Sequence, residues 1–223
     1  SATTSGCSAM LPRLTPTLLP LGDQALLVRY ADTLSDAANL AAVTLARQLA
    51  EDVPEGVEEI AAGLVSVLLR LAPGAEFARV RGEVILRLGT AAETTVTTRH
   101  QVAVTFDGED LADVATLVKL TPAEFIQRHN AVPLRVLATG FAPGFVYCGF
   151  HAPDLVVPRR ETVRPMVPAG TVLFAAGQTA IAATPIRTGW HVIGRTRFQN
   201  FDPSRSPPTT LQAGDDVRFI EAS

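Results

Sequence analysis

The sequence contains very little lysine and very little cysteine. Lys119 is the only lysine among the 19 basic residues, and the two cysteines are Cys7 and Cys148. The cysteines form no CxxC pair and no Cys/His cluster, which argues against a disulfide framework and against a zinc site. We therefore expect no structural metal and no disulfide in this chain.

Long apolar runs and a basic excess are also missing. No apolar run approaches the roughly 20 residues that a transmembrane helix needs. Residues 1–16 lack the charged and apolar regions of a secretory signal, so we interpret them as a disordered tail or as residues added to the natural chain. The formal net charge is −3, and no basic cluster indicates a nucleic-acid-binding surface. We expect a soluble, cytoplasmic protein that binds neither membrane nor nucleic acid.

The common motifs of stand-alone catalysis do not occur. There is no G-x-S-x-G nucleophile elbow. Lys119 is followed by Leu120 and has no glycine-rich segment before it, so no P-loop is present. Lys119 also has apolar neighbours in a segment expected to be helical, which argues against a biotin attachment site. If ATP is a cofactor, either this chain binds it without a P-loop or a partner subunit binds it.

The composition is that of a chain with a sizeable buried core. Hydrophobic residues make up 47% of the sequence and charged residues 18%, which is typical of globular proteins. A length of 223 residues allows one large domain or two small ones. The Thr-rich segment 89–99 separates two halves of different character. We predict an N-terminal domain over 17–98 and a C-terminal domain over 99–223.

The first half reads as alternating strands and helices. We predict a strand at 23–30 and a helix over 35–52 that begins at Ser35, a favourable N-cap. Two strands follow within 57–74, where Val67, Leu69 and Leu71 alternate with polar residues. A helix is expected over 76–89, and a final strand is possible within 89–99. This order is typical of a small ferredoxin-like α+β domain.

The second half reads as mainly β-structure. A strand is expected at 100–106, followed by two short helices. Thr121, Pro122 and Glu124 form the capping-box signature of the second helix. Five short apolar segments, at 133–141, 170–177, 178–184, 189–196 and 215–221, are separated by turn residues. This spacing favours a β-barrel or sandwich.

Residues 140–150, GFAPGFVYCGF, are the most unusual segment. Gly140, Gly144 and Gly149 allow tight turns and a close approach to a ligand or to another backbone. The four aromatic side chains of the segment could wall a pocket. The alternative is that the phenylalanines fill the core and the glycines form turns, which composition alone favours.

Segment 158–164, PRRETVR, gathers positive charge. Arg159, Arg160 and Arg164 lie near one turn, and guanidinium groups bind carboxylate or phosphate in two-point contacts. The alternative is a solvated hairpin tip in which an arginine pairs with Glu161.

Two further segments carry polar groups. Gln178 and Thr179 follow a glycine, where they could meet a polar substrate or satisfy a sheet edge. Trp190 and His191 are adjacent on an expected strand and so point to opposite faces. An isolated histidine such as His191 is more often structural than catalytic. The other histidines show no mutual metal-ligand spacing: His100, His129 and His151.

Taken in order, these segments resemble the signature of a known family. GFAPGF-Y-G, PRR, VPAG, GQT, GW--IGRT, FDP and LQAGDDVRF follow one another, and LPLGDQALLVRY at 19–30 matches the family's start. The chain is thereby identified as a member of the KipI family, also named allophanate hydrolase subunit 1. This family includes the B subunit of 5-oxoprolinase, and it resembles the C and D subdomains of the urea carboxylase carboxyltransferase region. The resemblance covers residues 17–221.

The resemblance implies a small α+β N-terminal domain followed by a cyclophilin-like β-barrel. It also implies a subunit of an ATP-dependent hydrolase that opens a cyclic amide, 5-oxoproline. The implied partners are a homologous second subunit, which is allophanate hydrolase subunit 2 or the C subunit of 5-oxoprolinase in type, and a lactam-utilisation subunit. The alternatives are an inhibitor of a sensor histidine kinase and the carboxyltransferase half of a biotin-dependent urea carboxylase, with biotin on a separate carrier.

The family motifs imply which residues bind substrate. The aromatic loop and the GQT segment would line a groove, and the arginines would take an anionic group. No general base stands out, so the catalytic residues are unassigned and a partner is expected to complete the site. Ala180, where the family usually has glycine, adds bulk, which favours a changed substrate or lost activity. The implied substrate-binding residues are Phe141, Pro143, Gly144, Phe145, Tyr147, Arg159, Arg160, Gln178, Thr179, Trp190, Arg195 and Thr196.

Overall fold

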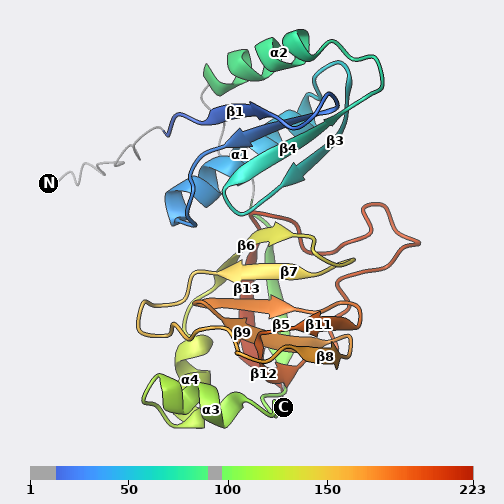
Figure 1. Cartoon of the computed structure of the whole chain (residues 1–223). Coiled ribbons are helices and arrows are strands. Elements are labelled where there is room, and N and C mark those ends of the chain that lie inside the picture. The colour runs from blue at the N-terminus through green and yellow to red at the C-terminus, as the bar shows by residue number, and fades with distance from the viewer. Residues whose placement is uncertain (1–13, 90–96, 223) are drawn as a thin grey trace, which may run out of the picture. The chain divides into compact units, whose positions relative to one another are not determined.

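The computed structural model describes residues 14–89 and 97–222 (Figure 1). The chain divides between residues 90 and 91 into two compact units, each with its own core. Most of the predicted tail at 1–16 and of the possible strand within 89–99 lies outside the described residues. Within the described ranges, no helix is both long and apolar enough to cross a membrane.

The N-terminal unit is a four-stranded antiparallel sheet with two helices. Its elements are β1 (Thr17–Pro20), β2 (Ala25–Arg29), α1 (Asp36–Glu51), β3 (Val57–Ala62), β4 (Ser66–Leu71) and α2 (Phe77–Gly89). The strand order is β1-β2-β4-β3, so β4 separates the two strands that α1 connects, as in a split β-α-β unit. The expected strand at 23–30 is β2, whereas β1 was not predicted. The ferredoxin-like assignment of this unit stays a prediction.

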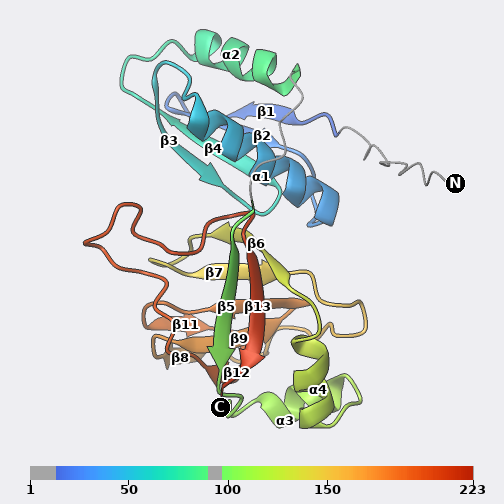
Figure 2. The ribbon, with the colours of Figure 1, turned by 180° about the vertical axis from the view of Figure 1, so that it is seen from behind.

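One core holds the N-terminal unit together. The Ser35 hydroxyl accepts a hydrogen bond from the Ala38 N–H at 3.3 Å, which confirms the predicted N-cap of α1. Leu45 of α1, Val84 of α2 and Leu69 of β4 are buried in the same hydrophobic cluster. Both helices therefore contribute to the core of this sheet, and Figure 2 shows α1 lying across it.

The C-terminal unit is a curled β-sheet with two short helices. Its elements are β5 (Arg99–Val104), α3 (Leu111–Leu117), α4 (Pro122–His129), β6 (Leu134–Thr139), β7 (Val146–Gly149), β8 (Arg164–Val167), β9 (Thr171–Ala175), β10 (Gln178–Ile181), β11 (Ile186–Thr188), β12 (His191–Arg195) and β13 (Asp216–Glu221). Seven strands follow the order β12-β9-β10-β7-β6-β13-β5, and β11 pairs with β8 in a small second sheet. The capping box predicted for α4 is present between Thr121 and Glu124.

The two ends of the seven-stranded sheet meet. Thr105, which directly follows β5, forms an isolated antiparallel bridge with Arg195 at the end of β12. The two residues exchange backbone hydrogen bonds of 2.8 and 3.0 Å. A sheet whose edge strands are joined in this way forms a barrel, so the mixed α+β class and the predicted barrel are confirmed.

Two sequence-based expectations about secondary structure were wrong. Residues 140–150 are not one loop, because Val146–Gly149 forms β7 in the middle of the sheet. Lys119 is not helical: it lies in the turn after α3 with φ of 59° and is exposed. Both errors come from tertiary pairing or turn geometry that local composition does not encode.

The C-terminal unit has two apolar layers. The barrel interior contains Val146, Phe174, Phe219 and other side chains from the inner faces of the strands. A second cluster, with Phe145 and Trp190, lies on the outer face of β7, β9 and β10 and also contains Val167 of β8 and Ile186 of β11. A strand of this barrel therefore buries side chains on both of its faces.

Candidate functional site

The alternation of β7 and β10 divides the predicted site residues between two faces. Thr179 pairs with Cys148 and Ala180 pairs with Tyr147 across the two strands. Because successive side chains point to opposite faces, Tyr147 and Gln178 lie on the outer face. Thr179 and Cys148 lie on the inner face. From the family motif we expected Gln178 and Thr179 to line one groove, whereas the structure places their side chains on opposite faces of the sheet.

Aromatic rings form a continuous row on the outer face, which we call the aromatic row. The ring centroids of Phe141 and Phe145 are 5.4 Å apart, those of Phe145 and Tyr147 are 4.8 Å apart, and those of Tyr147 and Trp190 are 5.9 Å apart, all edge-to-face. The Arg159 guanidinium carbon lies 5.8 Å from the Trp190 ring centroid, within the range of a cation–π contact. Phe141, Phe145 and Tyr147 of the predicted wall belong to this row, and their role in lining a substrate pocket stays a prediction.

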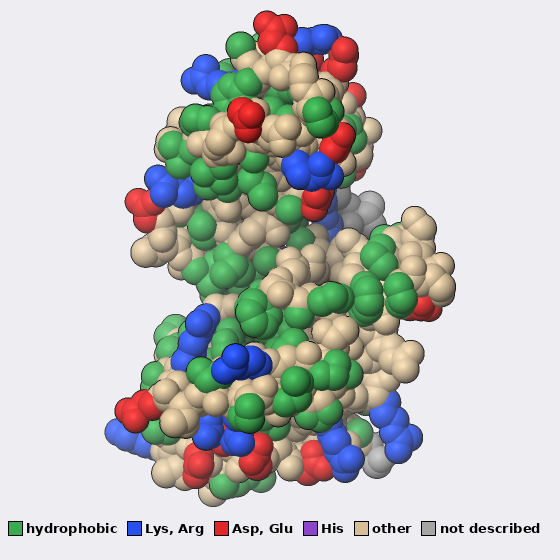
Figure 3. Space-filling model, turned by 45° about the vertical axis from the view of Figure 1, so that its right-hand side comes forward, with side chains coloured by type: hydrophobic (Ala, Val, Ile, Leu, Met, Phe, Trp, Pro, Cys, Tyr) green, Lys and Arg blue, Asp and Glu red, His purple; other side chains and the backbone are tan. Residues whose placement is uncertain are grey.

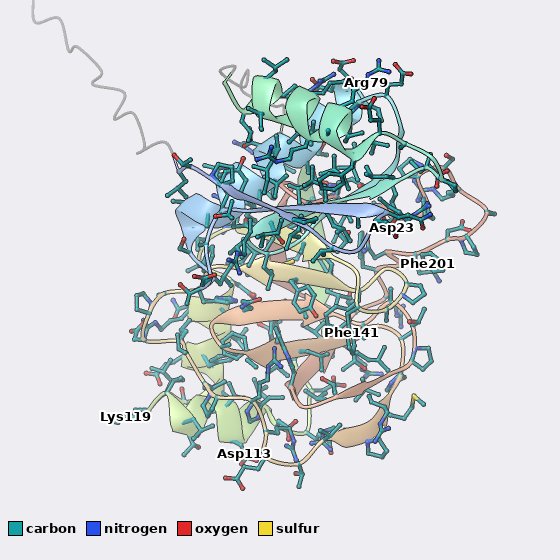
Figure 4. All side chains as sticks on the ribbon, turned by 45° about the horizontal axis from the view of Figure 1, so that its top comes forward. Asp23, Arg79, Asp113, Lys119, Phe141 and Phe201 are labelled. Carbon is teal, nitrogen blue, oxygen red and sulfur yellow. The ribbon has the colours of Figure 1, made fainter. Side chains whose placement is uncertain are left out.

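Exposure varies strongly along the aromatic row. Phe145 and Trp190 are 3% and 6% exposed and fill the outer layer, whereas Phe141 is 73% exposed (Figure 4). Burial raises the pKa of the half-buried Tyr147 hydroxyl, and the charge of Arg159 partly offsets that rise. Hydrophobic side chains gather on this face of the C-terminal unit in Figure 3. The row offers a surface where an apolar group and an anion can be held side by side.

Gly144 and Pro143 do not act together in the loop. Pro143 is exposed. Gly144 is buried with φ of +67°, and a Cβ there would lie 2.4 Å from the Phe201 Cβ and 2.8 Å from the Ala183 Cβ. Its carbonyl accepts a hydrogen bond from the Asn200 amide at 2.9 Å. The structural alternative expected a turn at this glycine; both its positive φ and the atoms packed around it require glycine here.

The arginines of segment 158–164 have different partners. Arg160 and Arg164 both donate to one carboxylate oxygen of Asp110, the latter at 2.7 Å. The other Asp110 oxygen accepts the Val192 N–H at 2.7 Å, and the residue is 3% exposed. A buried carboxylate that receives these donors holds both guanidinium groups. Arg160 is therefore part of the packing, which leaves Arg159 as the arginine of this segment that faces solvent.

Asp110 is a partner of the arginine segment that could not be recognised in the sequence. It precedes α3 at the N-cap position but makes no side-chain capping bond. An acidic residue at that position is normally interpreted as a helix cap, so nothing in the local sequence distinguishes it. Among the described residues, Arg159 forms no ion pair.

Gln178 and Thr179 differ in how their polar atoms are satisfied. Gln178 is 7% exposed, and its Oε1 atom is buried without a hydrogen-bond partner in the described structure. The fully buried Thr179 hydroxyl is 2.7 Å from His129 Nε2 and 2.8 Å from His151 Nε2. The two histidines, which show no metal-ligand spacing in the sequence, meet in the barrel interior.

The barrel interior disfavours the charged forms of its titratable side chains. Burial lowers the pKa of His129 to about 4 and that of His151 to about 2, the latter with the help of the neighbouring His129. Burial also raises the pKa of the Cys148 thiol to about 12. In the described ranges no three His, Cys, Asp or Glu side chains gather in a way that could hold a metal ion.

Arg195 and Thr196 lie at the barrel closure. Arg195 pairs with Asp107 at 2.8 Å. The Thr196 hydroxyl donates to the Ala103 carbonyl at 2.7 Å, and both residues line a hollow of about 280 Å³. This hollow involves none of the aromatic row. The twelve predicted residues therefore do not form a single groove.

His191 makes a structural contact, as expected for an isolated histidine. Its Nε2–H donates to the Pro158 carbonyl at 3.0 Å. This bond fixes the start of the arginine segment beside β12.

Comparison with known proteins relates the chain to one family. Residues 16–211 match the family model described as carboxyltransferase domain, subdomain C and D. The 5-oxoprolinase B subunit of Bacillus subtilis (strain 168) is 32% identical over 219 residues, 91% of each chain. The 5-oxoprolinase B subunit of Haemophilus influenzae is 43% identical over 113 residues, 51% of this chain and 53% of that protein.

Solved structures agree with this assignment. The crystal structure of TTHA0988 has a TM-score of 0.79 and 33% identity; the match covers 90% of this chain but only 40% of TTHA0988. PH0987 from Pyrococcus horikoshii, described as a conserved uncharacterized protein, has a TM-score of 0.54 and 28% identity over 93% of this chain and 98% of its own. The K. lactis urea amidolyase shares the fold, with a TM-score of 0.72 at 15% identity over 97% of this chain and 16% of its own.

The family match spans most of the sequence; LPLGDQALLVRY lies in the N-terminal unit, and the other motifs that suggested the family lie in the barrel unit. The chain belongs to the KipI (allophanate hydrolase subunit 1) family, which is built on subdomains C and D of the carboxyltransferase domain.

Proposed function

We propose that this chain is the B subunit of an ATP-dependent 5-oxoprolinase, which opens the lactam ring of 5-oxoproline to give glutamate. The observation that carries the proposal is the alignment with the 5-oxoprolinase B subunit of B. subtilis, which extends over 91% of both lengths. Such an enzyme works in the cytoplasm, where ATP is available.

The outer face supplies groups that suit this substrate. 5-Oxoproline carries one carboxylate on a small ring. Arg159, which has no ion pair among the described residues, lies over Trp190 and next to Tyr147. A guanidinium beside an aromatic surface binds a carboxylate while the ring packs on the apolar face. We assign the substrate carboxylate to Arg159 rather than to Arg160.

Among the described residues, the aromatic row and Arg159 offer binding groups, and none of them is a nucleophile hydrogen-bonded to a base. Cys148 lies in the barrel interior, and its raised pKa of about 12 keeps the thiol protonated near neutral pH. Thiols react as thiolates, so this residue is no nucleophile. The proposed enzyme therefore requires partner subunits, of which a homologous second subunit and a lactam-utilisation subunit are our candidates. ATP binds to the complex without a P-loop from this chain.

The test is glutamate formation and ATP hydrolysis in the presence of 5-oxoproline. This chain is assayed alone, with a homologous second subunit, and with both candidate partners. We expect turnover only in the complete mixture, in a complex whose interface buries well over ~1,000 Å². Turnover by the isolated chain, or none in a complex shown by gel filtration to be assembled, contradicts the proposal.

A further inference from the structure

The loops that precede β9 and follow β10 and β12 lie at the same end of the barrel, because these neighbouring strands are antiparallel. They line a hollow of about 750 Å³, which we call the loop hollow. Its lining consists of segments 169–170, 196–199 and 201–203 and of Ala183. This volume is typical of small-molecule sites. The VPAG, GW--IGRT and FDP segments of the family signature therefore meet at one hollow that the proposed function does not use.

Hydrogen bonds hold the loops around the loop hollow in place. The Gly170 N–H donates to the Ala182 carbonyl at 2.7 Å, and the Thr196 N–H donates to the Gly170 carbonyl at 2.8 Å. The buried Asn200, between two lining segments, donates its side-chain amide to the Gly144 carbonyl at 2.9 Å. The walls of the loop hollow are therefore fixed by the fold.

Arg197 brings a positive charge to the loop hollow. Its side chain is exposed and forms no ion pair with any residue that the structure describes. Arg195, two positions earlier, pairs with Asp107 at 2.8 Å instead. A guanidinium group binds a carboxylate through two parallel N–H donors. Arg197 is therefore suited to an anionic group of a ligand.

Asp202 brings a negative charge to the same hollow. One of its carboxylate oxygens accepts the Ser204 N–H at 2.9 Å and the Ser204 hydroxyl at 2.7 Å. These bonds, and to a smaller extent the charge of Arg205, lower the pKa of the Asp202 carboxyl, so it is ionised near neutral pH. The second oxygen receives no hydrogen bond in the described part of the chain, so it is available to a cationic group.

The two opposite charges line one hollow but do not pair with each other in the described structure. A simple anion would be attracted by Arg197 and repelled by Asp202, whereas a ligand with both signs of charge satisfies both. Gln199 adds an exposed amide to the lining, and Phe201 adds a half-buried ring. A small zwitterion with an aliphatic part matches this set of groups, and an α-amino acid is such a molecule.

We propose that the loop hollow binds a free α-amino acid, whose carboxylate contacts Arg197 and whose ammonium group contacts Asp202. In the reaction proposed above this amino acid is L-glutamate, so the loop hollow is a product site. The identity of the amino acid rests on the proposed function. The zwitterion site itself rests on the hollow and its two unpaired charges.

The chemistry of ring opening explains why such a site distinguishes product from substrate. The ring nitrogen of 5-oxoproline is a neutral amide with one hydrogen, so the substrate offers no cation to Asp202. Hydrolysis breaks the C–N bond, the oxygen of water bonds to the carbonyl carbon, and both protons of that water end on the nitrogen. The nitrogen becomes an ammonium group, which a carboxylate binds in a charge-assisted hydrogen bond.

The loop hollow adjoins the aromatic loop but differs from the proposed substrate face. Gly144 of that loop packs against Phe201 and Ala183, which both line the hollow. Arg159 and Trp190 are not among the described residues that line it. Substrate and product therefore have separate contacts on this chain, which two sets of reporters can distinguish.

The test is a ¹H–¹⁵N NMR titration of the isolated full chain at pH 7. The backbone amides of Gly170 and Ala183 report on the loop hollow, and the indole N–H of Trp190, the only tryptophan, reports on the substrate face. We expect L-glutamate to shift the two amides in a saturable way. Glutarate, which lacks only the amino group, should bind there at least about tenfold more weakly, and 5-oxoproline should shift the Trp190 indole instead.

Two charge-removing variants show whether the two named residues hold the ligand. Arg197→Gln and Asp202→Asn should each weaken L-glutamate binding about 10–100-fold, since hydrogen bonds to charged groups are strong. Asp202→Asn keeps an oxygen for Ser204, so the loop is preserved. The matched controls Arg187→Gln and Asp113→Asn, at exposed positions outside the hollow, should change the affinity by at most about twofold.

Three results would overturn the product site. The first is L-glutamate leaving the Gly170 and Ala183 resonances unchanged, and the second is control variants weakening binding as much as the hollow variants. The third is glutarate or 5-oxoproline binding in the hollow as tightly as L-glutamate. None of these measurements requires turnover. Lack of turnover in the assembled complex contradicts the hydrolase function instead, and a Trp190 indole that 5-oxoproline does not shift contradicts the substrate contact at Arg159.

Discussion

Two pairs of adjacent residues in the C-terminal unit have opposite environments. Arg160 is held by the buried Asp110, whereas Arg159 lies over Trp190 and has no ion pair in the described structure. The Thr179 hydroxyl is bonded to two histidines, whereas the Gln178 oxygen has no partner. In each pair, one member is held by polar contacts within the fold, whereas Arg159 has no ion pair and the Gln178 oxygen no hydrogen bond among the described residues. Neighbouring residues of one motif therefore differ in their environment.

The largest expected effect concerns Asp110, the buried carboxylate that pairs with Arg160. Asp110→Ala leaves Arg160 and Arg164 without their shared carboxylate and the Val192 N–H without its acceptor. Breaking a buried ion pair from one side typically costs about 3–5 kcal/mol, and we expect a loss of that size in the free energy of unfolding, measured with urea. Asp113→Ala, exposed in the first turn of α3 (Figure 4), should cost at most about 1 kcal/mol.

If Asp110→Ala lowers the free energy of unfolding by less than about 1 kcal/mol, the predicted difference between Arg160 and Arg159 is wrong. Arg160 would then be as free as Arg159, and both would be candidates for the substrate carboxylate.

A second prediction separates the buried and the exposed part of the aromatic loop. Gly144→Ala puts a methyl group against Phe201 and Ala183 at a positive φ. Left-handed backbone and overpacking each cost about 1–3 kcal/mol, so we expect a loss of about 2–4 kcal/mol in urea unfolding. Gly140→Ala shares the positive φ but meets no atom within 4 Å. Equal losses at both sites would show that packing at Gly144 is not the reason for the glycine.

The sequence correctly predicted the features that depend on interactions between residues close together in the chain. The Ser35 cap, the capping box at Thr121 and the alternation of β4 all depend on residues within a few positions of one another. The structural alternative was also correct for Phe145, because large aromatic side chains are usually buried, but not for Phe141, which is 73% exposed. The barrel strands could also be recognised, because turn residues separate their short apolar segments.

The pairing of polar groups could not be predicted from local sequence. Arg160 and Asp110 are 50 residues apart, as are His129 and Thr179. Nothing in either segment identifies its partner, because the barrel closure and the position of α4 decide the contact. The sequence therefore drew attention to the GQT and PRR segments without showing which residue of each is paired within the fold.

The third prediction sets the two neighbouring arginines against each other. In the assembled complex, Arg159→Ala should raise KM for 5-oxoproline about 10–100-fold, since hydrogen bonds to charged groups contribute about 1.5–3 kcal/mol. Its free energy of unfolding should change by at most about 0.5 kcal/mol, as at most exposed sites. Arg160→Ala should do the reverse, with a clear stability loss and a KM close to the parent's. Steady-state kinetics and urea unfolding on the same preparations decide between them.

Identical KM changes for the two variants would contradict the division. The substrate carboxylate would then depend on the shape of the whole segment rather than on one free guanidinium.

The last prediction concerns the two interior histidines and is read from the pH dependence of stability. His129 and His151 titrate near 6.5 when unfolded and at about 4 and about 2 when folded. Below pH 6.5 the unfolded chain therefore binds protons that the folded chain does not, and stability falls as pH falls. Each histidine contributes up to about 1.4 kcal/mol per pH unit. We expect the urea unfolding free energy to decrease steadily from pH 7 to pH 5.

The carboxylates with lowered pKa values, Glu124, Asp154 and Asp202, act in a different window. Their stabilisation is complete above their unfolded pKa and is lost only as pH falls below it, so the range from pH 5 to 6.5 isolates the histidines. His151→Phe removes one of the two groups and should flatten the slope in that range by about half. If the unfolding free energy keeps the same pH dependence after this substitution, His151 takes up a proton in the folded chain as readily as in the unfolded chain. The barrel interior would then tolerate a charged histidine, and the contrast between the inner and the outer face would be smaller.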